Sequence, residues 1–157
     1  MKIILIAVGK TAMDGISAGI DKYADRIRRY IGFEIQCIAD IKNAGNMPVM
    51  MLCGKEGEKL LNQLKNYNEF YLLDERGKEY SSAEFAGFIE KEMIRGVKTL
   101  VFVVGGAYGC SPDVRKKASG KISLSRMTFP HDIIRLIFTE QLYRALTILR
   151  GESYHHE

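Results

Sequence analysis

Short apolar runs of strand length recur along the chain, and the segments between them carry helical periodicity. Five runs fit a strand: residues 3–8, 33–39, 70–73, 99–104 and 122–124. Several of these runs are continuous rather than alternating, which is typical of strands buried on both faces. The pattern therefore predicts an α/β domain with a mainly parallel sheet flanked by helices.

Periodicity and capping signals predict where helices lie. The first helix carries an apolar stripe in steps of four and three: Ile16, Ile20, Tyr23, Ile27 and Tyr30. Such a stripe is typical of a surface helix. A second helix is expected over residues 48–66, where Gly54 and Gly57 weaken the helix and indicate close packing. Ser81 and Glu84 have the spacing of a capping box and predict the start of a third helix.

The predicted last helix, about residues 130–150, is apolar around most of its circumference. Its apolar residues include Ile133, Ile134, Leu136, Ile137, Phe138, Leu142, Leu146, Ile148 and Leu149. Because one face of a sheet cannot bury all of them, this helix needs a second partner, which we expect to be another subunit. The sequence predicts a homodimer.

Composition narrows the class of protein. The 157 residues are 46% hydrophobic and 27% charged, which predicts one globular domain over residues 1–157. The N-terminal apolar run is too short for a signal peptide, and no run approaches the roughly 20 residues of a membrane span. We therefore expect a cytoplasmic protein without a membrane partner.

The cysteines and the basic residues give weaker signals. Cys37, Cys53 and Cys110 are odd in number and widely spaced, so we expect reduced, mostly buried thiols and no metal site. The net charge of +4 permits a nucleic-acid partner without requiring one. Five basic residues without an acidic neighbour follow one another from position 115 to 126: Arg115, Lys116, Lys117, Lys121 and Arg126. They form either a positive field for phosphates or, as charge alone favours, an ordinary solvated face.

Two loops that follow predicted strands form the candidate ligand site. The strand at residues 99–104 leads into Gly105-Gly106-Ala107-Tyr108-Gly109, and a second loop spans residues 124–131. Glycines let a backbone approach a ligand closely, and neighbouring loops at strand ends form a crevice. A Rossmann-like nucleotide enzyme is disfavoured, because Ala107 stands where its G-x-G-x-x-G fingerprint requires glycine. Taken alone, the glycine loop is better explained as a tight turn between a strand and a helix.

These segments together resemble a known family. The matching segments are Ala7-Val8-Gly9-Lys10, Lys55-Glu56-Gly57-Glu58, Leu73-Asp74, the loop at 105–109, residues 124–131, residues 140–145 and Tyr154-His155. Over the whole chain they resemble RlmH, the 23S rRNA (pseudouridine-N3)-methyltransferase family of the SPOUT superfamily. Ser153 and His156 depart from residues common in that family, outside the cofactor loops.

The resemblance implies a SPOUT-type fold with a C-terminal trefoil knot, a dimer packed through the last helix, and S-adenosylmethionine as cofactor. Carried over position by position, the cofactor contacts would be Leu73, Gly105, Leu124, Ser125, Arg126, Met127, Thr128 and Phe129. We expect Gly105 to lie where the backbone approaches the cofactor too closely for a Cβ atom.

The resemblance also implies methyl transfer to N3 of a pseudouridine in 23S rRNA, presented by the assembled ribosome. His155 is then the candidate base or hydrogen-bond partner, Tyr154 a stacking or hydroxyl contact, and Arg144 an anchor for phosphate or a base carbonyl. His131 is a further catalytic candidate, with a structural role in its loop as the alternative.

The C-terminal tail is expected to act on a partner subunit. Residues 151–157 span at most about 25 Å, so Tyr154 and His155 would reach the cofactor crevice of the other chain. A frayed terminus or a purification tag is the alternative interpretation of the tail. For the whole protein, the alternative is a ribosome-associated RNA-binding module with this fold and no activity, and the intact loops favour the enzyme.

Overall fold

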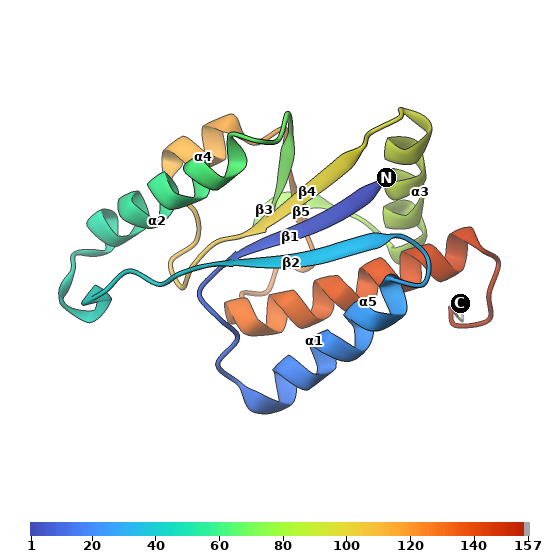
Figure 1. The fold of residues 1–157 in the computed structure, drawn as a ribbon, viewed down its shortest axis with the longest axis horizontal. Helices are drawn as coiled ribbons and strands as arrows, with labels where there is room; N and C mark the ends of the chain where they lie inside the picture. The colour runs from blue at the N-terminus through green and yellow to red at the C-terminus, as the bar shows by residue number, and fades with distance from the viewer. Residues whose placement is uncertain (156–157) are drawn as a thin grey trace.

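The structure, a computed structural model, describes residues 1–155 and confirms the predicted α/β class. Within these residues five strands form one sheet: β1 (Lys2–Val8), β2 (Gly32–Ile38), β3 (Phe70–Glu79), β4 (Thr99–Val104) and β5 (Gly120–Ser123). All pairings between these strands are parallel, in the order β2-β1-β4-β3-β5 (Figure 1). Strand β3 is longer than its apolar run, because its second half pairs with β5 after a break in register.

The helices expected over residues 48–66, after Ser81 and over residues 130–150 begin within one residue of the predicted positions. The helices are α1 (Asp14–Ile27), α2 (Val49–Leu64), α3 (Ser82–Ile94), α4 (Pro112–Lys117) and α5 (His131–Leu149), with a short 3-10 helix, η1 (Ala44–Asn46), before α2. The Ser81 hydroxyl accepts from the Glu84 N–H, and the Glu84 carboxylate accepts from the Ser81 N–H. This capping box confirms the predicted start of α3.

The direction of each crossover decides which face of the sheet its helix covers. The β1–β2 and β3–β4 connections run toward the β2 edge, whereas the β2–β3 and β4–β5 connections run the opposite way. Because parallel crossovers are right-handed, α1 and α3 cover one face and α2 and α4 the other. Figure 1 shows α2 and α4 on one side of the sheet and α1 and α5 on the other.

The central strands bury alternate side chains in two separate cores. Ile3, Leu5 and Ala7 of β1 face α1, α3 and α5, whereas Ile4, Ile6 and Val8 face α2 and α4. Strand β4 alternates in the same way, and all of its core side chains are buried. Burial on both faces explains why these strands are continuous apolar runs.

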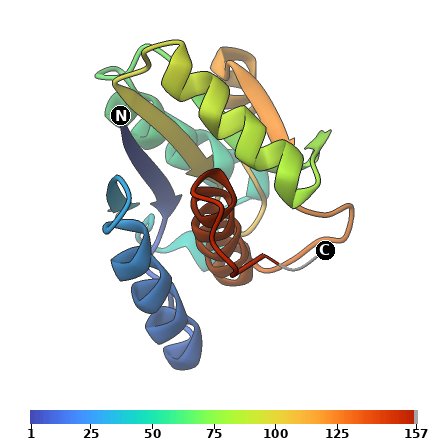
Figure 2. The same cartoon turned by 90° about the vertical axis from the view of Figure 1, so that its right-hand side faces the viewer.

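Part of the apolar surface of helix α5 that the sheet does not cover packs against other helices of the same chain. Helix α5 contacts α1 on one flank and α3 on the other, and Figure 2 shows it between them. Phe138, Leu142 and Leu146 of α5 are buried within the chain itself, so these residues need no second subunit to cover them. The patterning argument for a homodimer is weaker than the sequence suggested, and the homodimer stays a prediction.

Two other expectations need correction. Gly57 packs closely, because a Cβ atom there would collide with the Ser111 side chain at the start of α4, but Gly54 faces open space. The three cysteines are free, as expected, but they are not mostly buried: Cys37 is exposed on the edge strand β2, and Cys53 and Cys110 are partly exposed. Within residues 1–155 no helix is long and apolar enough to cross a membrane.

The core on the α3 face predicts unequal effects of one substitution at two positions of the same helix. Ile89 is fully buried and Ile94 is 80% exposed. Ile89→Ala is expected to lower the free energy of unfolding by about 2–5 kcal/mol, because it leaves a cavity. Ile94→Ala, its control, is expected to change it by less than about 0.5 kcal/mol. Urea denaturation of both variants measures the difference, and equal losses would contradict this packing.

Candidate functional site

A cavity of about 460 Å³ opens where β4 and β5 end, beside β3. Most of its lining comes from three segments: residues 73–75 of β3, the glycine loop at 105–109, and the loop and helix start at 124–131 without Arg126. Val104, Arg115 and Ile134 complete the lining. The juxtaposition of the three segments follows from the strand order, because the carboxyl ends of neighbouring parallel strands meet at one edge of the sheet. The predicted crevice between the two loops is confirmed.

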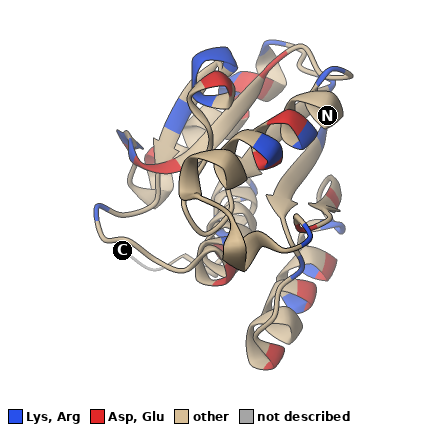
Figure 3. Cartoon of the chain, turned by 90° about the vertical axis from the view of Figure 1, so that its left-hand side faces the viewer, with Lys and Arg blue, Asp and Glu red and all other residues tan. Residues whose placement is uncertain are grey.

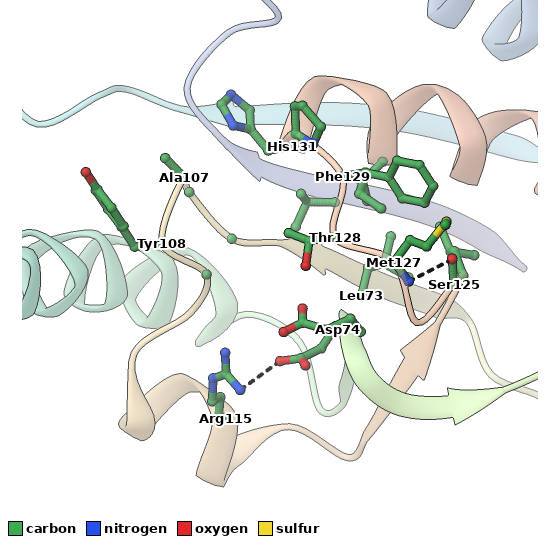
Figure 4. Close-up of a pocket in the computed structure, with 18 residues that line it drawn as sticks. Leu73, Asp74, Ala107, Tyr108, Arg115, Ser125, Met127, Thr128, Phe129 and His131 are labelled. Carbon is green, nitrogen blue, oxygen red and sulfur yellow. Dashed lines mark hydrogen bonds and ion pairs between the residues drawn. The ribbon is translucent and has the colours of Figure 1, made fainter.

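Most residues predicted to contact the cofactor line this cavity. They are Leu73, Gly105, Leu124, Ser125, Met127, Thr128 and Phe129, and His131 lines it as well (Figure 4). A hydrogen bond from the Met127 N–H to Ser125 Oγ, at 3.0 Å, fixes the turn in the second loop. The Arg126 side chain does not line the cavity, because its Nε donates to Glu79 Oε1 at 2.9 Å and both side chains are largely exposed.

The glycine loop folds tightly on itself. Its Gly109 N–H donates to Gly106 O at 2.9 Å, and Gly109 has a φ of +79°. A Cβ atom on Gly105 would lie 2.6 Å from the Gly109 carbonyl carbon and 2.9 Å from Cys110 Sγ. The return of the loop onto Gly109 and Cys110 therefore already requires a glycine at position 105. The predicted close approach of the cofactor to this backbone stays a prediction.

An ion pair joins β3 to the start of α4 at the edge of the cavity. Arg115 Nη1 lies 2.9 Å from Asp74 Oδ2, and Arg115 Nε donates to Cys110 O at 3.0 Å. A dashed line marks the ion pair in Figure 4. The Asp74 side chain is only 5% exposed. Arg115 therefore holds the end of the glycine loop against β3. Sequence reasoning missed this role, although an acid that directly follows the apolar run 70–73 was the available signal.

Two ion pairs reduce the unpaired positive charge of the basic segment at residues 115–126. Arg115 and Arg126 are each neutralised by a carboxylate, whereas Lys116, Lys117 and Lys121 are exposed. Figure 3 shows Lys and Arg interspersed with Asp and Glu over the face that carries α2 and α4. The expected positive field is thus limited to three lysines.

Burial makes Cys110 unsuitable as a nucleophile. Desolvation raises the pKa of its thiol to about 12, and the neighbouring Arg115 only partly opposes this effect. The N-terminus of α4 therefore does not produce a thiolate here, and the plain structural interpretation of Cys110 holds.

The first turn of α5 is tied to the loop after β1 by buried polar groups. Asp132 Oδ2 accepts from the Ala12 N–H at 3.0 Å. Arg135 donates to Val8 O at 2.5 Å and to Thr11 Oγ1 at 3.1 Å, and His131 Nε2 lies 3.4 Å from Asp132 Oδ1. These contacts fix His131 at the edge of the cavity.

The other predicted catalytic residues lie together, farther along α5. Arg144 pairs with Glu140 at 2.6 Å and lies 3.4 Å from His155 Nδ1. The Tyr154 hydroxyl donates to Glu140 Oε1 at 3.1 Å and lies 3.2 Å from the Tyr23 hydroxyl. Glu140 is therefore the common partner of this group, and its i,i+4 spacing to Arg144 was the signal in the sequence.

This cluster is separate from the cavity of its own chain. Arg144, Tyr154 and His155 are all absent from the cavity lining. Burial raises the pKa of Tyr154, and its hydrogen bond with Tyr23 adds to the shift, so the phenol stays protonated at neutral pH. The tail is packed as far as His155, and the predictions about His156 lie outside the described residues.

Comparison with known proteins agrees with this geometry. A family model described as "Predicted SPOUT methyltransferase" matches residues 1–155. Over the full length of both chains, the protein is 52% identical to the Ribosomal RNA large subunit methyltransferase H of Parabacteroides distasonis and 50% identical to that of Flavobacterium psychrophilum.

A solved structure supports the fold at low sequence identity. A probable methyltransferase from Bordetella pertussis superposes with a TM-score of 0.57 over 92% of this chain and 96% of its own, at 12% identity. The whole-chain match to the family model and the 50% identity to full-length relatives decide the assignment. The chain belongs to the SPOUT methyltransferase family.

Proposed function

We propose that the protein transfers the methyl group of S-adenosylmethionine to N3 of a pseudouridine in 23S rRNA, on the assembled ribosome. The observation that carries this proposal is about 50% identity, over whole chains, to relatives named Ribosomal RNA large subunit methyltransferase H. The cavity built by the predicted cofactor loops supports it. A ribosomal substrate also fits the expected cytoplasmic location.

The cavity fits the proposed cofactor in size and chemistry. Its volume of about 460 Å³ lies in the range of small-molecule sites. Leu73, Val104 and Leu124 give apolar cover for an adenine ring, and the loop at 105–109 offers backbone groups. Ser125, Met127, Thr128 and Phe129 would close the other side, with Arg126 contributing through its backbone. When bound, S-adenosylmethionine supplies an electrophilic methyl group. The trefoil knot implied by the resemblance stays a prediction.

The chemistry requires a positioned and deprotonated nucleophile. N3 of pseudouridine is an imide nitrogen, which attacks a methyl group poorly until its proton leaves. His155 is the proposed base or hydrogen-bond partner, Tyr154 the proposed stacking contact, and Arg144 the proposed anchor for phosphate or a carbonyl. An adjacent cation favours the imidate, and alignment of nitrogen, methyl and sulfur lowers the barrier further.

These residues are proposed to act in the partner subunit of a homodimer. Arg144, Tyr154 and His155 do not line the cavity of their own chain, whereas helix α5 carries His131 at the cavity and this cluster farther along. Two subunits packed through α5 would place the cluster of one chain over the cofactor loops of the other. The three exposed lysines near α4 and β5 would meet rRNA phosphates.

Methyl transfer to intact ribosomes tests the proposed function directly. Ribosomes that lack the modification are expected to accept labelled methyl groups, whereas protein-free 23S rRNA is not, because residues 1–155 form one unit around a single sheet and the assembled ribosome presents the pseudouridine to it. Mass spectrometry of the labelled nucleoside locates the methyl group at N3 of pseudouridine. Equal labelling of both substrates contradicts presentation by the ribosome. A folded protein that binds ribosomes but no cofactor supports the non-catalytic alternative.

The ion pair at the edge of the cavity predicts a loss of cofactor affinity when it is broken. Arg115→Gln removes the bonds that hold the glycine loop to Asp74 and Cys110. We expect the dissociation constant for S-adenosylmethionine to rise by roughly tenfold to a hundredfold, as for a lost charged hydrogen bond. Lys116→Gln is the control, because Lys116 is exposed and unpaired in the described structure. Calorimetric titration compares the two variants, and identical affinities would remove the proposed role of Arg115.

Complementation between two inactive chains tests the composite site. Gly105→Val breaks the glycine loop, because its side chain collides with Gly109 and Cys110, and is expected to abolish cofactor binding. Deletion of residues 153–157 removes the contacts of Tyr154 with Glu140 and Tyr23, but Tyr154 belongs to neither core, so the fold is expected to persist while methyl transfer falls strongly. In mixed dimers one site keeps both an intact loop and an intact tail, so activity should return. Inactive heterodimers would show that the tail acts within its own subunit.

A further inference from the structure

A second cavity, of about 280 Å³, lies on the other side of the glycine loop from the proposed cofactor cavity. Residues that it shares with the first cavity are Gly106, Ala107, Tyr108 and His131. Its remaining walls come from the end of β1, the segment after β2, and α2, through Val8, Asp40, Leu52 and Glu56. The two hollows therefore border each other along the glycine loop and the first residue of α5.

The strand order explains why two hollows occur side by side. Strand β4 lies between β1 and β3, and α4, which follows β4, covers the opposite face from α1 and α3. The segment that leaves β4 therefore runs to one face of the sheet, and the segments that leave its neighbours β1 and β3 run to the other face. Such divergence opens a crevice between neighbouring strands of a parallel sheet. The first cavity occupies the β4–β3 crevice and the second the β1–β4 crevice.

Glu56 is a buried carboxylate that lines this second cavity. Only 8% of the residue is exposed, and its Oε2 is buried without a hydrogen-bond partner in the described part of the chain. The carboxylate lies against the glycine loop, since a Cβ atom on Gly106 would be 2.5 Å from Glu56 Oε2. An unpartnered buried carboxylate costs free energy that a bound donor would recover.

A second carboxylate stands at the mouth of the same cavity. Asp40 is exposed and its carboxylate lies against Gly9, where a Cβ atom would collide with it. The nearby Lys59 donates instead to the backbone oxygens of Ala39 and Asp40, at 2.9 and 3.4 Å. Burial raises the pKa of Glu56 and the charge of Asp40 raises it further, whereas the charge of Lys59 lowers it. The cavity therefore combines two acidic groups with no basic side chain paired to either in residues 1–155.

We propose that Glu56 and Asp40 bind an alkylammonium group, namely the α-amino group in the methionine part of S-adenosylmethionine. The inference rests on the proposed function, because it needs an adenosyl group in the first cavity. Both hollows have Tyr108 and His131 in their linings, so the proposal requires the methionine chain of the cofactor to pass beside these two residues from one hollow to the other. A metal ion is the poorer occupant, because the described residues contain no group of three or more His, Cys, Asp or Glu side chains that could hold one.

Three neutral-sulfur ligands and one pair of matched variants test this site by calorimetric titration of the full chain. The ligands are S-adenosylhomocysteine, its analogue with hydrogen in place of the α-amino group, and 5′-methylthioadenosine. Glu56→Gln keeps the shape of the side chain and removes its charge. Glu58→Gln, on the exposed side of the same helix, is the control.

The wild-type protein is expected to prefer S-adenosylhomocysteine over its deaminated analogue by roughly tenfold to a hundredfold, as for a hydrogen bond to a charged group. Glu56→Gln should abolish this preference and leave the affinity for 5′-methylthioadenosine within about twofold, because the adenosyl cavity is untouched. Glu58→Gln should change neither. Asp40→Asn, a variant at the exposed mouth with little risk to folding, should reduce the same preference in part.

The outcomes separate this inference from the function on which it rests. If both Glu56→Gln and Asp40→Asn keep the full preference for the amino group while 5′-methylthioadenosine still binds, the ammonium site is wrong and the proposed function stands. If the folded wild-type protein binds none of the three ligands, the proposed function fails and the ammonium site fails with it.

Discussion

Strands β1 and β4 bury side chains on both of their faces, and this burial places every other element of the fold. A strand covered on both sides needs helices above and below the sheet. Right-handed crossovers supply them alternately, α1 and α3 on one face and α2 and α4 on the other. The chain therefore diverges on each side of the β4 carboxyl end, and the two cavities lie where it diverges.

The glycine loop after β4 lines both cavities, and different neighbours exclude a side chain at each of its first two glycines. Gly105 is required by the return of the loop onto Gly109 and Cys110, whereas Gly106 faces the carboxylate of Glu56. Arg115 anchors the end of the loop to β3 through Asp74. A change in the position of this loop would thus alter both hollows together.

Helix α5 links the cavity to the C-terminal tail. Its first turn is fixed by Arg135, which bonds the loop after β1, and by Asp132 beside His131. Farther along, Glu140 gathers Arg144 and Tyr154 on one surface of the helix. Helix α5 packs against α1 and α3, so its own chain covers much of its apolar circumference.

The sequence by itself determined the approximate positions of the five strands, the starts of three helices and the two loops that line the main cavity, because burial periodicity and capping act over short stretches of chain. It also placed Leu73, Gly105 and most of residues 124–129 at the site, through the family resemblance. Only the tertiary structure decided that Arg126 pairs with Glu79, that Arg115 pairs with Asp74, and that Glu56 packs against the glycine loop. Each of these contacts joins residues distant along the chain, so it depends on strand order and helix faces that local patterns do not encode.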